Sequence, residues 1–313
     1  LPIYNVITKL EENPYIFSSD KLVSFKKVDL IAEKLEIPSN DQRRIREAIV
    51  QYISYNHTNK GNIFVNKDDL LKGLSEYLNK YGSYRVKLVL SIPEIEEAIK
   101  YLIKNEIIAI EIDKNNNSYV YSKFYLDMEN NIVKLLEKML NHNSLETVSS
   151  IQIKDFLEKS NIPASNNQKQ AIIMALSNKL SILNGGAGTG KSATAKFIVD
   201  TIKNFNPNAK IELAAPTGKA ARKLSEYTGM EAKTIHRLIG LNGLGERARP
   251  LKEVNADYLI IDEASMIDTY LFYSLLSVIS NKTQVLIMGD YNQLPSIGPG
   301  AILRDLIESK LIP

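Results

Sequence analysis

The sequence predicts an α/β protein in which a parallel sheet covered by helices follows a mainly helical region. From about residue 165 onward, short apolar runs alternate with Gly, Pro and Thr turns and with longer helical patterns, which is typical of repeated βα units. The residues before about 145 are instead rich in Lys, Glu, Asn, Ile and Tyr. Polar connectors within 141–165 mark the seam. We therefore expect segments at 1–38, 39–145 and 146–313.

Composition places the chain among globular proteins of about two domains. It has 313 residues, 44% hydrophobic and 24% charged, and this excludes disordered, collagen-like and coiled-coil classes. The absence of Cys excludes a disulfide scaffold and a Cys-ligated zinc, and it fits a cytoplasmic location. No run approaches the roughly 20 apolar residues that span a membrane. Because the net charge is only +3, a nucleic acid would have to bind locally gathered basic groups.

The first half predicts short helices separated by a strand. The pattern of 28–35 is an amphipathic helix that must end before the next proline. Asn40 or Asp41 can cap the following helix. A short strand at 62–65 comes next, and Asn66 caps the helix after it.

A further helix and a hairpin complete this half. Ser91 caps the helix, which has Pro93 in its first turn, and the hairpin strands are 107–112 and 118–121. The order helix, strand, helix, helix, hairpin is that of a winged helix. Such a domain binds DNA in some proteins and serves as a packing or protein-contact module in others, so both roles stay open.

A glycine-rich loop at 185–192, Gly-Gly-Ala-Gly-Thr-Gly-Lys-Ser, is the strongest functional signal. It follows the apolar run 180–183 and precedes a helical pattern, a context that a chance glycine-rich turn would lack. Backbone N–H groups of such a loop cradle phosphate oxygens at the positive end of a helix. Lys191 would bind the β- and γ-phosphates of ATP, and the Ser192 hydroxyl would ligate Mg²⁺. The other phosphate-binding positions are Gly186, Gly188, Thr189 and Gly190.

Two adjacent carboxylates, Asp262 and Glu263, follow the apolar run 258–261. Ligands of α/β sheets bind at the carboxyl ends of the strands, so we expect this pair beside the phosphates. Asp262 would lie next to Mg²⁺, through a coordinated water, and Glu263 would polarise the water that attacks the γ-phosphate. An isolated Asp-Glu pair is more often a solvated helix start, but this one follows the glycine-rich loop by about seventy residues.

A third apolar run, 285–288, leads into a polar loop. Gln293 in that loop is our candidate for a γ-phosphate sensor, because its amide can donate to phosphate and accept from water. The predicted catalytic set is therefore Lys191, Asp262, Glu263 and Gln293.

Several blocks of the second half resemble the ordered early motifs of superfamily-one DNA helicases. Two of them, Ala-Pro-Thr-Gly-Lys-Ala-Ala and Thr-Ile-His-Arg-Leu, are similar to the RecD-like branch. The resemblance implies a RecA-like P-loop NTPase sheet, ATP hydrolysis with Mg²⁺, and contact of Gln168 with the adenine edge. The blocks are 168–171, 185–192, 214–222, 234–238, 262–265 and 289–296.

The resemblance also implies a path for single-stranded DNA. Short polar and basic groups on loops hold phosphates, and the affinity then falls with salt. His236 could instead cap a helix or pack in a core, and Arg222 could belong to a solvated helix face. Contact with the DNA strand is favoured for Thr217 and His236. The residues of the implied path are Pro216, Thr217, Lys219, Thr234, His236 and Arg237.

The start of the chain resembles the region that precedes the motor in the longer RecD-like helicases. Asn13-Pro14-Tyr15 and the run 25–32 are similar to a helix-hairpin-helix element there. The sequence departs from that element at Val23 and Ser24, where its glycine-bearing hairpin is expected.

The motifs predict a P-loop ATPase, and the resemblance to the RecD-like branch implies an ATP-dependent helicase that moves 5′ to 3′ on single-stranded DNA. The resemblance implies a monomer, with single-strand-binding or repair proteins as candidate partners and no membrane. The chain starts without Met and has no match to a second RecA-like motor domain before it ends at Pro313. We therefore expect a fragment that binds ATP weakly, hydrolyses it slowly and does not unwind DNA, because the arginines of that domain are worth about 10³–10⁵ in turnover.

Two other functions stay open. One is a different P-loop ATPase, of the clamp-loader or RNA-directed kind, although the segment 216–219 argues against it. The other is an ATP-gated DNA-binding or partner-docking module that does not unwind DNA.

Overall fold

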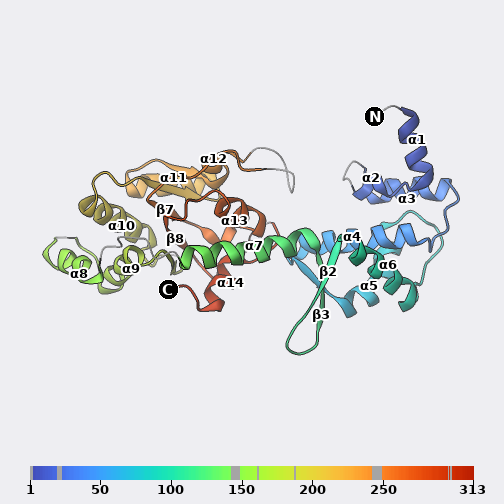
Figure 1. The fold of residues 1–313 in the computed structure, drawn as a ribbon, viewed down its shortest axis with the longest axis horizontal. Coiled ribbons are helices and arrows are strands. Elements are labelled where there is room, and N and C mark those ends of the chain that lie inside the picture. The colour runs from blue at the N-terminus through green and yellow to red at the C-terminus, as the bar shows by residue number, and fades with distance from the viewer. Residues whose placement is uncertain are drawn as a thin grey trace. The chain divides into compact units, whose positions relative to one another are not determined.

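The computed structural model describes residues 3–19, 23–141, 149–160, 162–186, 188–241, 249–294, 296 and 298–313. Part of the expected connector, 142–148, lies outside these residues, as do Ala187 and Pro295 of the motifs. The chain forms two compact units, 1–127 and 128–313, and their boundary falls within helix α7 (Lys123–Leu140) (Figure 1). None of the helices in the described ranges combines the length and apolarity that a bilayer-crossing segment needs.

The first unit is mainly helical and carries a small antiparallel sheet in the order β1-β3-β2. The predicted order of helix, strand, two helices and hairpin is confirmed by α4, β1, α5, α6 and the β2–β3 pair. Asp41 and Asn66 cap their helices as predicted. The elements are α1 (Ile3–Glu12), α2 (Ile16–Ser19), α3 (Phe25–Lys34), α4 (Gln42–Lys60), β1 (Phe64–Asn66), α5 (Lys67–Tyr81), α6 (Ile92–Lys104), β2 (Ile108–Ile112) and β3 (Ser118–Ser122).

The second unit is built on a five-stranded parallel sheet in the order β4-β8-β7-β5-β6. This confirms the predicted α/β class. The strands are β4 (Leu180–Asn184), β5 (Ile211–Ala215), β6 (Ala232–Thr234), β7 (Tyr258–Ile261) and β8 (Gln284–Gly289). The helices that follow α7 are α8 (Ser150–Lys159), α9 (Asn166–Ser177), α10 (Lys191–Phe205), α11 (Gly218–Thr228), α12 (Ile235–Ile239), α13 (Thr269–Leu276) and α14 (Ile302–Ser309).

Helices cover both faces of this sheet, and alternate strand residues point to opposite faces. On one face, Leu259 and Ile261 of β7 pack with the apolar residues of α7, α12, α13 and α14. On the other face, Ile260 packs with those of α8, α9, α10 and α11. The central strands therefore consist of nearly continuous apolar residues, which is why the sequence shows short apolar runs there.

The carboxyl ends of all five strands meet at one edge of the sheet because the strands are parallel. Along that edge lie, in order, the glycine-rich loop after β4, the polar loop after β8, the two carboxylates after β7, the short loop between β5 and α11, and the junction of β6 with α12. Segments up to about 100 residues apart in the sequence are thus neighbours in the fold.

Candidate active site

The loop between β4 and α10 has a backbone that only glycine adopts easily. Gly188 and Gly190 have φ angles of 77° and 83°, in the left-handed region, and Gly190 caps the N-terminus of α10. The Thr189 hydroxyl donates to the Gly186 carbonyl at 2.8 Å, which closes the turn. The Lys191 ammonium donates to the carbonyls of Gly185 and Gly186. The loop is therefore a compact nest at the positive end of a helix.

A cavity of about 370 Å³ opens on this loop. It brings together nine predicted residues from three separate segments of the chain: Gly186, Gly188, Thr189, Gly190, Lys191, Ser192, Asp262, Glu263 and Gln293. It also includes Ala193 and, from α11, Lys223 and Tyr227, which sequence reasoning missed.

Asp262 is buried at the end of β7, with 8% of its surface exposed. Burial raises the pKa of this carboxyl above the ordinary aspartate value. The hydrogen bond from the Glu263 N–H, at 2.9 Å, and the positive charges of Lys191 and Lys223 offset part of the shift. Such a site favours a cation, since a nearby positive charge stabilises the ionised form.

Glu263 occupies a strained position next to Asp262. Its φ angle is 54°, in the left-handed region, where a residue with a side chain costs on the order of 1 kcal/mol or more. The residue directly precedes a single 3-10 turn (Ala264–Met266). This sharp change of direction after β7 places the carboxylates of both Asp262 and Glu263 on the cavity.

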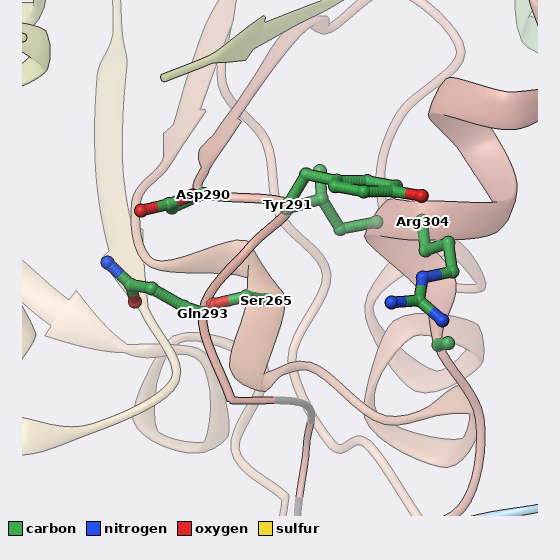
Figure 2. Close-up of a pocket in the computed structure, with 7 residues that line it drawn as sticks. Ser265, Asp290, Tyr291, Gln293 and Arg304 are labelled. Atoms are coloured by element: carbon green, nitrogen blue, oxygen red, sulfur yellow. The ribbon is translucent and has the colours of Figure 1, made fainter. Parts of the chain in front are cut away.

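Gln293 lines the main cavity and also a smaller one of about 90 Å³ beside it. Figure 2 shows Gln293 and Ser265 on the wall of the smaller cavity, with Asp290, Tyr291 and Arg304. The loop is held locally, because the Gln293 N–H donates to the Asp290 carbonyl at 3.1 Å. The Ser265 hydroxyl is buried without a hydrogen-bond partner among the described residues, a feature that no local sequence signal could have revealed.

Gln168 lies beside the glycine-rich loop but is engaged in a helix cap. Its side-chain oxygen accepts from the Ser165 N–H at 2.9 Å, in a capping box at the start of α9. Its amide nitrogen faces Gly190, where an added Cβ would come within 3.1 Å of it. The amide N–H₂ is therefore the part of Gln168 available to a ligand.

The residues of the implied DNA path lie at the carboxyl ends of β5 and β6 and at the starts of α11 and α12. Ala215 pairs with Thr234 in the sheet, so the two strand ends lie side by side. Thr217 and Thr234 cap α11 and α12, each accepting a backbone N–H at 3.2 Å. Both hydroxyls still have a hydrogen to donate.

The basic members of this set are accessible. Lys219 and His236 are exposed, and Arg237 has 71% of its side chain exposed, 3.6 Å from Glu231. His236 is therefore neither a core residue nor the cap of α12, since Thr234 has that role. Arg222 is 84% exposed and pairs with Glu226 at 3.2 Å, as on a solvated helix face. Pro216 is half-buried between β5 and α11.

Two family models match the chain. Residues 168–299 match a model described as AAA domain, and residues 4–64 match the HHH domain of the ATP-dependent RecD2 DNA helicase. The first match covers the sheet from α9 to the polar loop after β8, and the second runs from α1 to β1.

Curated relatives agree with both matches. The chain is 28% identical over 310 residues to the ATP-dependent RecD2 DNA helicase of Deinococcus radiodurans, covering 97% of this chain and 42% of that protein. It is 35% identical over 193 residues to the RecBCD enzyme subunit RecD of Buchnera aphidicola, covering 55% of this chain and 32% of that protein. The chain thus spans less than half the length of either relative.

Among solved structures, the chain is similar to the Pif1 helicase of Candida albicans. The two are 26% identical, with a TM-score of 0.33, over 42% of this chain and 34% of that one.

Proposed function

We propose that this chain, which carries the N-terminal region and first motor domain of a RecD-like helicase, binds ATP with Mg²⁺ and serves an enzyme that moves 5′ to 3′ on single-stranded DNA. The observation that carries the proposal is the order of loops along one sheet edge. The loops proposed for the phosphates follow β4, β8 and β7, and those proposed for DNA follow the adjacent β5 and β6. A nucleotide and a DNA strand would thus share one edge of one sheet.

The donor set on the cavity fits Mg²⁺. The Ser192 hydroxyl and the Asp262 carboxylate are hard oxygen donors, and Mg²⁺ commonly binds through one or two such groups together with substrate phosphates and water. When bound, the ion would neutralise charge on the β- and γ-phosphates. Lys191 would leave the loop carbonyls of Gly185 and Gly186 for the phosphate oxygens, which accept its hydrogen bonds more strongly because they are charged.

Glu263 and Gln293 would act on the attacking water. The Glu263 carboxylate would accept a proton from the water as it adds to the γ-phosphorus and the bond to the ADP oxygen breaks. Gln293 would donate its amide N–H to the γ-phosphate and accept from the same water. Both side chains lie on the cavity wall with Lys191, which supports these roles.

Single-stranded DNA would follow the carboxyl ends of β5 and β6 and the first turns of α11 and α12. Hydroxyls of Thr217 and Thr234 can donate to phosphates, and the exposed Lys219, His236 and Arg237 supply positive charge. Strand polarity, a monomeric state, repair-protein partners, a cytoplasmic location and segment divisions at 38 and 145 stay predictions.

Single-turnover hydrolysis of ATP by the chain, with and without nucleic acid, tests the proposal. We expect slow phosphate release that oligo-dT accelerates more than duplex DNA or oligo-U does. Stronger acceleration by oligo-U would favour an RNA-directed ATPase. DNA binding that depends on ATP without any hydrolysis would favour a gated binding module.

Lys191→Ala tests the nucleotide site directly. Its ammonium donates to two carbonyls of the glycine-rich loop and, within the part of the chain that the structure describes, to no core group, so the variant should keep its circular dichroism spectrum and lose binding of a fluorescent ATP analogue. Equal affinity of variant and parent would remove Lys191 from the phosphate site.

A further inference from the structure

One face of α11 connects the two ligand regions of the sheet edge. Lys219, Lys223 and Tyr227 are spaced four residues apart, so they lie on one face of the helix, each about 6 Å further along its axis. Lys219 lies in the first turn, next to Thr217 of the loop proposed for DNA. Lys223 and Tyr227 line the nucleotide cavity.

The cavity wall contains a second lysine, from a different element than the glycine-rich loop. Lys191 of α10 and Lys223 of α11 both line the cavity. Two ammonium groups from separate helices are therefore available to the phosphates of a bound nucleotide.

The surroundings of Lys223 differ from those of its neighbour in sequence. Arg222 pairs with Glu226 and is 84% exposed, so its charge is compensated by a neighbour on the solvent side. The Lys223 ammonium lies over the ring of Tyr227, with Nζ 5.8 Å from the ring centroid. A cation at that distance from an aromatic ring is attracted by its face.

We propose that Lys223 binds the terminal phosphate of the nucleotide and that Tyr227 positions it there. Because Lys219 and Lys223 belong to one rigid helix, occupancy of the nucleotide site would be transmitted along α11 to the strand-binding loop. The inference rests on the proposed function and adds to it a γ-phosphate contact and a route of coupling.

The affinities of Lys223→Ala for ATP and ADP test the phosphate contact, and Arg222→Ala is the matched control on the same helix. Loss of a charge-assisted hydrogen bond should weaken binding of a fluorescent ATP analogue about ten-fold. The ADP analogue lacks the terminal phosphate, so its affinity should change less than about two-fold. Arg222→Ala should leave both affinities and their ratio unchanged. A ratio in Lys223→Ala equal to that in Arg222→Ala would overturn the inference.

Tyr227 and Lys219 variants test positioning and coupling. Tyr227→Ala should lower the ratio of the affinity for the ATP analogue to that for the ADP analogue. Tyr227→Phe keeps the ring and should have the ratio of the parent chain. Lys219→Ala should weaken binding of oligo-dT and keep the nucleotide preference. Binding of oligo-dT should respond to the ATP analogue in the parent chain and respond less in Lys223→Ala. An undiminished response would refute the route through α11.

Lys191→Ala separates the failure of this inference from the failure of the proposed function. If Lys191→Ala abolishes binding and Lys223→Ala keeps the parent preference, only the inference is wrong. If Lys191→Ala also binds normally, the nucleotide site itself is wrong.

Discussion

Asp29 and Arg44 form a buried, two-pronged ion pair in the first unit. Arg44 Nε donates to Asp29 Oδ1 at 2.7 Å and Nη2 donates to Oδ2 at 2.9 Å, with both side chains almost fully buried. The same carboxylate accepts two further hydrogen bonds. The Tyr15 hydroxyl donates to Asp29 Oδ1 at 2.9 Å, and the Ser83 N–H donates to Oδ2 at 2.8 Å. The pair therefore ties α3 and α4 to Tyr15, which precedes α2, and to Ser83, which follows α5.

We expect Asp29→Asn to destabilise the first unit by about 3–5 kcal/mol, because it leaves the Arg44 charge buried without a counter-ion. Urea unfolding followed by circular dichroism measures this. Lys67→Ala, which removes a half-exposed partner of Glu96, should cost only about 0–1 kcal/mol. The double variant Asp29→Leu, Arg44→Met should recover part of the loss. If Asp29→Asn costs no more than Lys67→Ala, the pair contributes little to stability.

Glu263→Gln should keep ATP affinity and lower the rate of hydrolysis by about 10²–10⁴, since an amide cannot accept the proton of the attacking water. The left-handed backbone at this position is the same for Glu and Gln, so the fold should be unaffected. Single-turnover phosphate release, with nucleotide affinity measured in parallel, is the test. A rate within about three-fold of the parent would place the base elsewhere.

The stability of the second unit should fall as pH rises between about 4.5 and 7. Burial and the nearby Asp305 carboxylate raise the pKa of Glu129 from its ordinary 4.5 to about 7. In that window the folded state binds more protons than the unfolded state, so the free energy of unfolding decreases with pH, by at most about 1.4 kcal/mol per pH unit.

Glu129→Gln should make this slope less steep in urea unfolding at pH 5, 6 and 7. Part of the slope should remain, because burial also raises the pKa of Asp262 and of Asp305. Glu137→Gln removes an exposed carboxylate from the same helix and controls for the loss of one negative charge. A slope in Glu129→Gln equal to that in Glu137→Gln would assign the pH dependence to other groups.

Single-stranded DNA should bind the chain better than duplex does, in the micromolar range or weaker, through the loops after β5 and β6. Lys219→Ala, Arg237→Ala should reduce the affinity for labelled oligo-dT, measured by anisotropy. The slope of the logarithm of the binding constant against the logarithm of the salt concentration should also become shallower by about 1.4, because each lost phosphate contact on single strands contributes about 0.7 to it.

The control is a double variant, Lys203→Ala with Lys210→Ala, that removes the same amount of positive charge from the opposite edge of the sheet. Lys203 lies at the end of α10, and Lys210 directly precedes β5. This control should leave both affinity and slope nearly unchanged. An equal effect of the two double variants, or a signal independent of salt, would move the DNA site to the first unit, residues 1–127.

Much of the cavity on the glycine-rich loop could be predicted because its signals are local in the chain. The loop at 185–192 needs glycines for its left-handed turns, and Asp262 and Glu263 follow a strand directly. Lys223 and Tyr227 could not be found in this way, because helical spacing places them on one face without indicating what that face meets. The same holds for Ser265, whose burial depends on the loop after β8.

Local sequence patterns predict the strands, the caps and the glycine-rich loop, because apolar runs, capping side chains and glycine conformations act over a few residues. The strand order β4-β8-β7-β5-β6, and with it the proximity of Lys191, Asp262 and Gln293, depends on tertiary packing. Packing also brings Asp29 to Arg44 and presents Lys223 of α11 to the cavity. These relationships join segments that are distant in the chain, and they follow from burying both faces of a sheet and from pairing charges that burial removes from water.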